Sequence, residues 1–265
     1  MQELEVKMEQ LGHLPNYRPF DPVDQVGSSF IYLLTVYHYY YCCCCFPPKA
    51  ILFAALGDED QDEENSERIK KLIKNGTTRM SIVNEEGSTL LYVACENTAL
   101  TDGEEIVELM LERGANVNAK CEGGKTPLMN CCDSKNYSIL PVLLKWGADA
   151  NETFFGVTAL WFACLQSDVP VSVVSQLAHR MDASINFGSQ IEISGESGDF
   201  CKGSTPLHCA AKCNASWSVL QHLVEAGADL DSVDEDGRKP CDYLPQRDHC
   251  DDDPRKRHLL QAPVL

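Results

Sequence analysis

The chain repeats itself, and this repetition limits its possible folds more than any other feature. A glycine, a spacer, a threonine and the apolar start of a helix recur, and a second motif of glycine, alanine and Asn or Asp lies between the copies. The first motif begins at Gly87, Gly124, Gly156 and Gly203, with a weaker copy at Gly237, and the second begins at Gly114, Gly147 and Gly227. The first-motif glycines are 37, 32, 47 and 34 residues apart. Two interleaved motifs near one period predict an array of repeated units.

Residues 124–151 show which local structure one copy encodes. Thr126 suits a helix N-cap, and Pro127 suits the first helical position, where no amide hydrogen is needed. A second helix is expected from about Ser138 to Trp146, because its apolar residues follow helical spacing. Gly147 then allows the left-handed conformation that ends a helix. The unit reads as turn, short helix, short helix and turn, and it needs neighbours to bury its apolar face.

Two copies carry the first motif in its fullest form, at Lys125–Leu128 and Ser204–Ala211. These residues resemble the ankyrin signature, and the Gly-Ala-Asn/Asp motif resembles the close of that repeat. The resemblance covers residues 84–245. It implies an all-α, ankyrin-repeat solenoid of stacked helix-turn-helix units with β-turn fingertips. It also implies that the turns and first helices line a concave groove, which makes the chain a non-enzymatic adaptor or scaffold for a protein partner.

The repeats divide the chain into three parts. Residues 46–247 are expected to form the ankyrin-repeat domain, with about four full repeats and degenerate copies at both ends. The long interval before Gly203 predicts a loop insertion near 187–199, on the edge that carries the turns. An apolar arm rich in Tyr and Cys, residues 1–45, precedes the domain, and a charged tail, residues 248–265, follows it.

Residues 25–48 contain no Asp, Glu, Lys or Arg and end near four adjacent cysteines, Cys42–Cys45. We favour an arm that packs on the first repeat or is poorly ordered. A membrane anchor is the alternative, either as a span of about 20 apolar residues or through palmitoylation of the cysteines. Contiguous cysteines lack the spacing of a zinc site, so no metal is expected.

Composition and motifs argue against several function classes. A net charge of −18 repels phosphate backbones, so nucleic acid is not expected as a partner. No phosphate-binding loop, Gly-x-Ser-x-Gly or His-Glu-x-x-His motif is present, so neither an enzyme nor a cofactor is predicted. His208 resembles the ankyrin histidine that hydrogen-bonds between repeats. The 14 cysteines read as reduced thiols, which favours a cytoplasmic location, with the nucleus as an alternative.

The resemblance assigns the partner-binding positions to the turns and to the ends of the first helices. Phe154 and Phe155 are unusual in a turn and suggest an apolar anchor, unless one of them folds under the inserted loop. Carboxylates gather in the first half of the array and favour a partner with a basic surface. A substrate adaptor of a ubiquitin ligase remains an alternative function. The candidate residues are Glu85, Glu86, Glu96, Glu122, Lys125, Asp133, Phe154, Phe155, Val157, Leu165, Lys202 and Lys212.

Overall fold

The computed structural model describes residues 48–57, 63–76, 79–180, 183–195, 198–244 and 254–261. The chain divides into two units, Met1–Pro47 and Pro48–Leu265. The first unit lies outside the described residues, and with it the predicted arm, the alternative membrane anchor and Cys42–Cys45. All the described helices and strands belong to the second unit.

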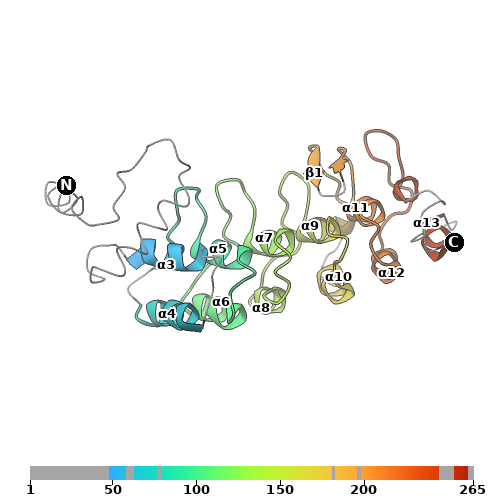
Figure 1. The fold of residues 1–265 in the computed structure, drawn as a ribbon. Coiled ribbons are helices and arrows are strands. Elements are labelled where there is room, and N and C mark those ends of the chain that lie inside the picture. Colours follow the sequence, from blue (N-terminus) through green and yellow to red (C-terminus); the bar gives the residue numbers. More distant parts are fainter. Residues whose placement is uncertain are drawn as a thin grey trace, which may run out of the picture. The chain divides into compact units, whose positions relative to one another are not determined.

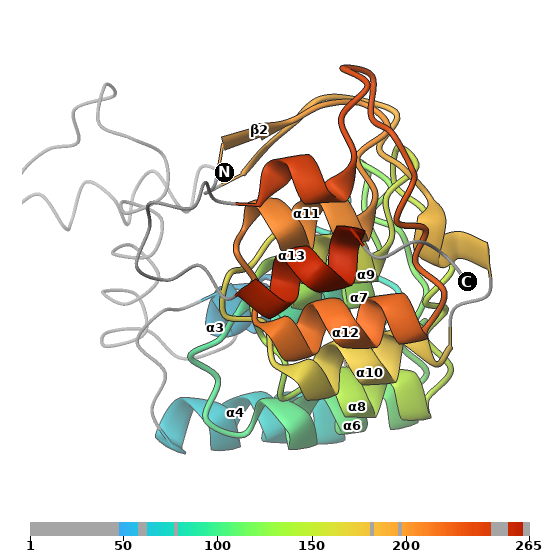
Figure 2. The ribbon, with the colours of Figure 1, turned by 90° about the vertical axis from the view of Figure 1, so that its right-hand side faces the viewer.

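Paired helices make up most of the second unit. Each first helix packs against the first helix of the next pair, and the second helices form another row (Figures 1 and 2). The predicted all-α ankyrin-repeat solenoid is thereby confirmed. The pairs in the described ranges are α3 (Pro48–Gly57) with α4 (Glu63–Lys74), α5 (Leu90–Glu96) with α6 (Gly103–Glu112), α7 (Pro127–Asp133) with α8 (Leu140–Lys145), α9 (Ala159–Cys164) with α10 (Val171–Ala178), and α11 (Pro206–Lys212) with α12 (Trp217–Glu225).

The first helices begin where threonine can cap them. The Thr126 side chain accepts a hydrogen bond from the Met129 amide at 3.3 Å, and Pro127 occupies the first turn of α7, as predicted. Gly147, with φ of 84°, follows α8 in the left-handed region. The second helix of this unit is shorter than expected because the amides of Tyr137 and Ile139 bond within the preceding turn.

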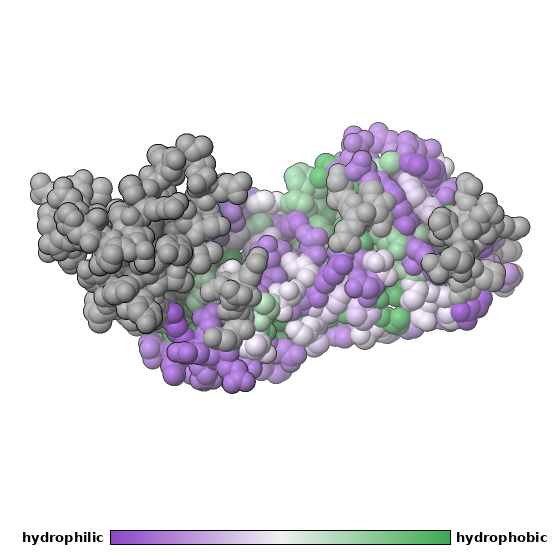
Figure 3. All heavy atoms as spheres, in the orientation of Figure 1, coloured by the Kyte–Doolittle hydropathy of each residue, from purple (hydrophilic) through white to green (hydrophobic). Residues whose placement is uncertain are grey.

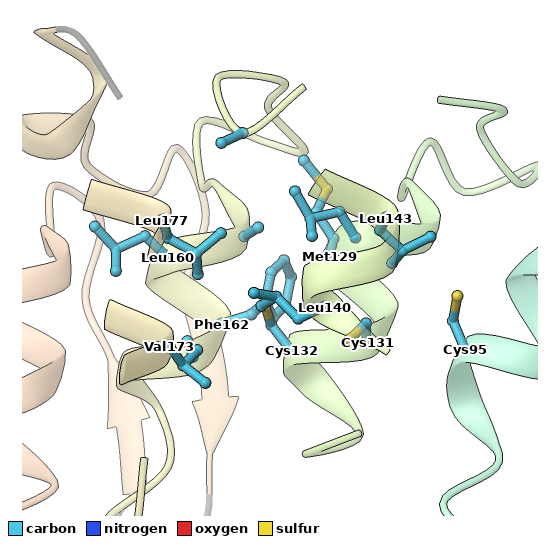
Figure 4. Close-up of a cluster of buried hydrophobic side chains, with 14 of the residues drawn as sticks. Cys95, Met129, Cys131, Cys132, Leu140, Leu143, Leu160, Phe162, Val173 and Leu177 are labelled. Carbon is cyan, nitrogen blue, oxygen red and sulfur yellow. The ribbon is translucent and has the colours of Figure 1, made fainter. Parts of the chain in front are cut away.

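The core is shared between neighbouring pairs. Figure 4 shows Cys132 and Leu140 of one pair facing Leu160, Phe162 and Val173 of the next. Burying one such leucine or phenylalanine stabilises the fold by roughly 1.5–3 kcal/mol, and the neighbouring pair supplies much of the surface that covers it. A single pair therefore cannot hold its fold alone, which is the physical basis of the array.

Two aromatic side chains bind the turn of the following repeat at the same position of their helices. His208 bonds to the carbonyl of Arg238 at 3.1 Å, which agrees with the role that the ankyrin resemblance implied. Trp161 takes the equivalent role one repeat earlier and donates its indole N–H to the carbonyl of Ser204 at 2.8 Å. Both side chains are buried, and each therefore fixes one turn against the previous helix.

His208 also makes the stability of the array depend on pH. Burial lowers the pKa of this imidazole below its ordinary value of 6.5, and its Nδ1 accepts from the Thr205 amide at 3.1 Å. Below pH 6.5 the His208 imidazole of the unfolded chain binds a proton more readily than that of the folded chain. We therefore expect the free energy of unfolding to decrease as the pH is lowered from roughly 7.5 to 5.5, and urea unfolding at each pH would measure this decrease.

The matched variant is His208→Gln, which keeps an amide donor for the Arg238 carbonyl and removes the titration. Its free energy of unfolding should change less over the same pH interval. Equal pH dependence in the two proteins would show that His208 does not cause it.

Asparagines link the closing turns of successive repeats. Asn118 accepts from the Asp149 amide at 2.9 Å and donates to the Gly147 carbonyl at 3.2 Å. Asn186, at the end of a 3₁₀ turn (Ala183–Asn186), makes the same two bonds to the amide of Asp229 and the carbonyl of Gly227. The repeat between Gly156 and Gly203 has no copy of the Gly-Ala-Asn/Asp motif, but through Asn186 it keeps the link to its neighbour.

The insertion near 187–199 contains two strands, where the sequence predicted a loop. Strand β1 (Ile193–Gly195) pairs antiparallel with β2 (Gly198–Phe200), with Ile193 opposite Phe200. The Gly, Ser and Glu residues of this segment suggested a long loop. The hairpin forms because Phe200 has an apolar partner on the array, Trp161.

The tail predicted at 248–265 contains a helix, α13 (Pro254–Gln261). It packs against α12 and against the 3₁₀ turn η2 (Pro240–Tyr243). Helix α13 thus takes the position that the second helix of a further repeat would have. Leu260 is buried, and the ammonium of Lys256 donates to Asn214 Oδ1 at 2.7 Å. The side chains of Arg255 and His258 remain exposed, so a helix rich in basic residues can still end the array.

Candidate protein-binding face

The turns before the first helices, here called fingers, lie directly against one another. A Cβ placed on Gly87 would come within 2.8 Å of the Glu122 Cβ, and one on Gly203 within 3.1 Å of the Asp234 Cα. Gly87 also has φ of 68°, so a side chain there would be strained as well as crowded. The fingers and the exposed ends of the first helices together form what we call the finger face.

Carboxylates dominate the N-terminal half of the finger face. Glu85, Glu86 and Glu122 are exposed, and the contact between Gly87 and Glu122 brings them together. Glu96 is exposed at the end of α5. Within the described part of the chain none of these four carboxylates has an ion-pair partner, so their charge is available to a cation from outside.

Two of the charged candidate residues form an ion pair with each other. Lys125 Nζ lies 2.7 Å from Asp133 Oδ2 and 4.6 Å from the centroid of the Phe162 ring. The lysine therefore neutralises the aspartate and covers an aromatic ring of α9. A partner would meet this pair as a nearly neutral surface between the acidic and the aromatic parts of the face.

The two phenylalanines of the next finger have different environments. Phe154 is half-buried, and its ring centroid lies 4.6 Å from that of Phe155 and 6.4 Å from that of Phe162. Phe155 is 51% exposed and has φ of 47°, which is unusual for a bulky residue. The inserted segment binds its backbone through a 2.8 Å bond from the Gln190 amide to the Phe155 carbonyl. Figure 3 shows the apolar surface at this turn.

Four of the candidate partner-binding residues do not contribute to the acidic and aromatic surface described above. Val157 is fully buried and Leu165 is 8% exposed, so a partner could not use either as an anchor. The turn points Val157 inward, and Leu165 belongs to the shared core. Lys202 lies on the finger that carries the inserted hairpin, 3.9 Å from Glu235 Oε2. Lys212 is bound to the hairpin itself through the Asp199 carbonyl.

Sequence reasoning also missed residues that shape the face. Phe162 and Trp161 were assigned no role, although the Phe162 ring packs against Phe154 of its own finger and the Trp161 indole donates to the Ser204 carbonyl of the next. Phe200, just past the predicted insertion at 187–199, was also assigned no role. The available signal was an aromatic residue placed directly before the finger motif at Cys201–Gly203.

The buried thiols of the described residues are poor nucleophiles. Burial raises the pKa of the Cys131 thiol to about 12 and holds the pKa values of Cys95, Cys132 and Cys209 well above the ordinary range. In the ranges that the structure describes, no three His, Cys, Asp or Glu side chains are grouped as metal ligands. No helix in those ranges combines the length and the apolar character that crossing a bilayer requires.

Comparisons with known proteins agree with the repeat architecture. A family model described as ankyrin repeats (3 copies) matches residues 52–154, and one described as ankyrin repeat matches residues 202–235. The chain is 28% identical over 146 residues to alpha-latrocrustotoxin-Lt1a of Latrodectus tredecimguttatus, a match that covers 54% of this chain and 9% of the toxin. It is 30% identical to the ankyrin repeat and KH domain-containing protein mask-1 of Caenorhabditis elegans, covering 52% of this chain and 5% of that protein.

A solved structure shows the same fold. It is that of the Bd0816 predatory endopeptidase of Bdellovibrio bacteriovorus in complex with the immunity protein Bd3460. The match has a TM-score of 0.55 and 21% sequence identity, and it covers 72% of this chain and 89% of that chain. The chain spans only 9% and 5% of the lengths of the two curated relatives above.

Proposed function

The chain belongs to the ankyrin-repeat family, whose repeats are protein-protein interaction modules, and we propose that it is a non-enzymatic adaptor or scaffold that binds a partner with a basic surface. The finger face would bind this partner through Glu85, Glu86, Glu122 and Phe155. Free thiols in the core support a reducing, cytoplasmic setting.

One observation carries this proposal: an exposed aromatic ring beside carboxylates that have no cation of their own. The contact of Gly124 with Phe154, 3.7 Å from a Cβ placed on the glycine, joins the acidic finger of Glu122 to the aromatic finger. Exposed aromatic residues often supply much of the binding energy at interfaces. Carboxylates around them mainly raise the association rate of a basic partner and reject acidic ones.

We expect Phe155→Ala to weaken binding of the physiological partner by roughly tenfold or more, because the half-exposed ring becomes buried in the complex. The partner would be identified by proximity labelling with the full chain. Its dissociation constant would then be measured by isothermal titration with purified proteins. The variant Glu85→Gln/Glu86→Gln/Glu122→Gln should slow association and reduce its dependence on salt.

The control is Trp146→Ala, which removes another exposed aromatic side chain, at the end of α8 in the other row of helices. Its affinity should match that of the unchanged chain. If Phe155→Ala also binds with unchanged affinity, the aromatic finger is not the anchor.

A further inference from the structure

The hairpin is an elongation of one finger. The Ser189 amide bonds to the Ser204 carbonyl at 3.1 Å, as the Asp234 amide bonds to the Arg238 carbonyl at 3.0 Å in the next finger. Only residues 235–237 lie between the members of the second pair, whereas residues 190–203 lie between those of the first. The extra chain therefore extends from a finger whose base is intact.

This elongated finger folds back on the first helices. Phe200 is 1% exposed, and its ring centroid lies 5.7 Å from that of Trp161 on α9, in an edge-to-face arrangement. Lys212, at the end of α11, donates to the Asp199 carbonyl, and its Nζ lies 4.4 Å from the Phe200 ring centroid. Figure 2 shows β2 beside α11, on the side away from α12.

The surface beneath the hairpin is aromatic and cationic. Lys212 has no carboxylate partner in the ranges that the structure describes, and its ammonium lies between the rings of Phe200 and Tyr243, 5.6 Å from the latter. The segment that covers it has the opposite charge: residues 187–201 include acidic residues such as Glu192 and Asp199 and contain no Lys or Arg. The chemistry of the hairpin thus matches the surface on which it lies.

We propose that Trp161, Lys212 and Tyr243 form a second binding site, for an extended acidic segment with an aromatic side chain, and that the hairpin occupies this site as an internal ligand. A partner segment binds there by displacing the hairpin. Strands of three residues are marginally stable by themselves, so the Phe200 contact decides whether the hairpin stays. This site uses other residues of the finger face than Glu85, Glu86, Glu122 and Phe155, and its ligand has the opposite charge.

The test is a full chain with residues 191–201 deleted. The deletion leaves Gln190, Lys202 and Gly203 between Ser189 and Ser204, the same length as the next finger. A labelled synthetic peptide of residues 191–201, with serine in place of Cys201, would be titrated by fluorescence anisotropy. We expect saturable binding to the shortened chain and roughly tenfold weaker binding to the unchanged chain, in which the tethered hairpin competes. The peptide with Phe200→Ala should bind the shortened chain roughly tenfold more weakly or not at all.

A second variant covers the case in which the shortened chain does not fold. In the full chain, Phe200→Ala should free the hairpin, so that its amides exchange faster with solvent and the same peptide binds. The control is Phe187→Ala, which removes an exposed ring near the start of the same segment and should bind the peptide as weakly as the unchanged chain does. A folded shortened chain that fails to bind the peptide, or unchanged hydrogen exchange in full-length Phe200→Ala, would overturn the proposal. Neither result would affect the test of Phe155.

Discussion

Replacing Trp161 by alanine is expected to lower the free energy of unfolding by about 3–5 kcal/mol, the usual cost of truncating a large buried aromatic side chain. The indole is fully buried in α9, and its N–H donates to the Ser204 carbonyl at 2.8 Å. The substitution leaves a cavity between two repeats and removes one of the two donors to the Ser204 carbonyl, which keeps its bond from the Ser189 amide. Urea unfolding followed by circular dichroism would measure the loss, because this signal does not depend on tryptophan.

The position of Trp161 within the array predicts a second effect. Stability in a solenoid depends on interfaces between neighbouring repeats, and this residue lies at the interface between α9 and the following finger. Weakening it should let the two ends of the array unfold at different urea concentrations, which lowers the apparent m-value. Trp146→Ala, at a position that is 39% exposed, should cost less than about 1 kcal/mol. Similar losses in the two variants would contradict the assignment of Trp161 to the core.

The repeat architecture could be predicted because its signals act within a few residues. Thr126 caps the helix that starts beside it, and Gly147 adopts its left-handed conformation directly after α8. Such local rules need no knowledge of distant contacts. The order of the helices then followed from the repeat period alone.

The binding face was predicted less completely, because exposure depends on tertiary contacts. Within a finger, Phe155 points outward and Val157 inward, although the two residues are close in sequence and both apolar. Which of them meets solvent is decided by the stacking of the neighbouring fingers. The phenylalanine pair was singled out by its residue type, but only the structure separates the exposed ring of Phe155 from the packed ring of Phe154.

Helix α13 and the hairpin escaped prediction for a related reason. A helix of eight residues rarely forms in isolation, so the tail showed no convincing helical pattern. Packing against α12 and the bonds of Lys256 to Asn214 provide the missing stability. The hairpin likewise depends on one aromatic contact with a residue more than thirty positions away, Trp161.

We expect the buried cysteines to react with iodoacetamide at least about a thousandfold more slowly than Cys121, which is partly exposed. The thiolate is the reactive species, and burial raises the pKa of Cys131 to about 12, so almost none of it is ionised near pH 8. Its Sγ also donates to the Asn136 carbonyl at 2.9 Å. Mass spectrometry of the digested protein after timed labelling would give a rate for each site. The protected set is Cys95, Cys131, Cys132, Cys164, Cys209 and Cys213.

The order of the rates within this set tests how the array opens. Each repeat is held by its neighbours, so an interior repeat loses two interfaces when it opens and a terminal repeat loses one. Local opening from the ends should therefore expose Cys95 sooner than Cys132 or Cys164. A low concentration of urea should widen the difference, because it favours partial opening before the whole array unfolds. If Cys132 and Cys164 react as fast as Cys121 in the native protein, the interior interfaces are open in solution and the shared core does not hold the repeats together.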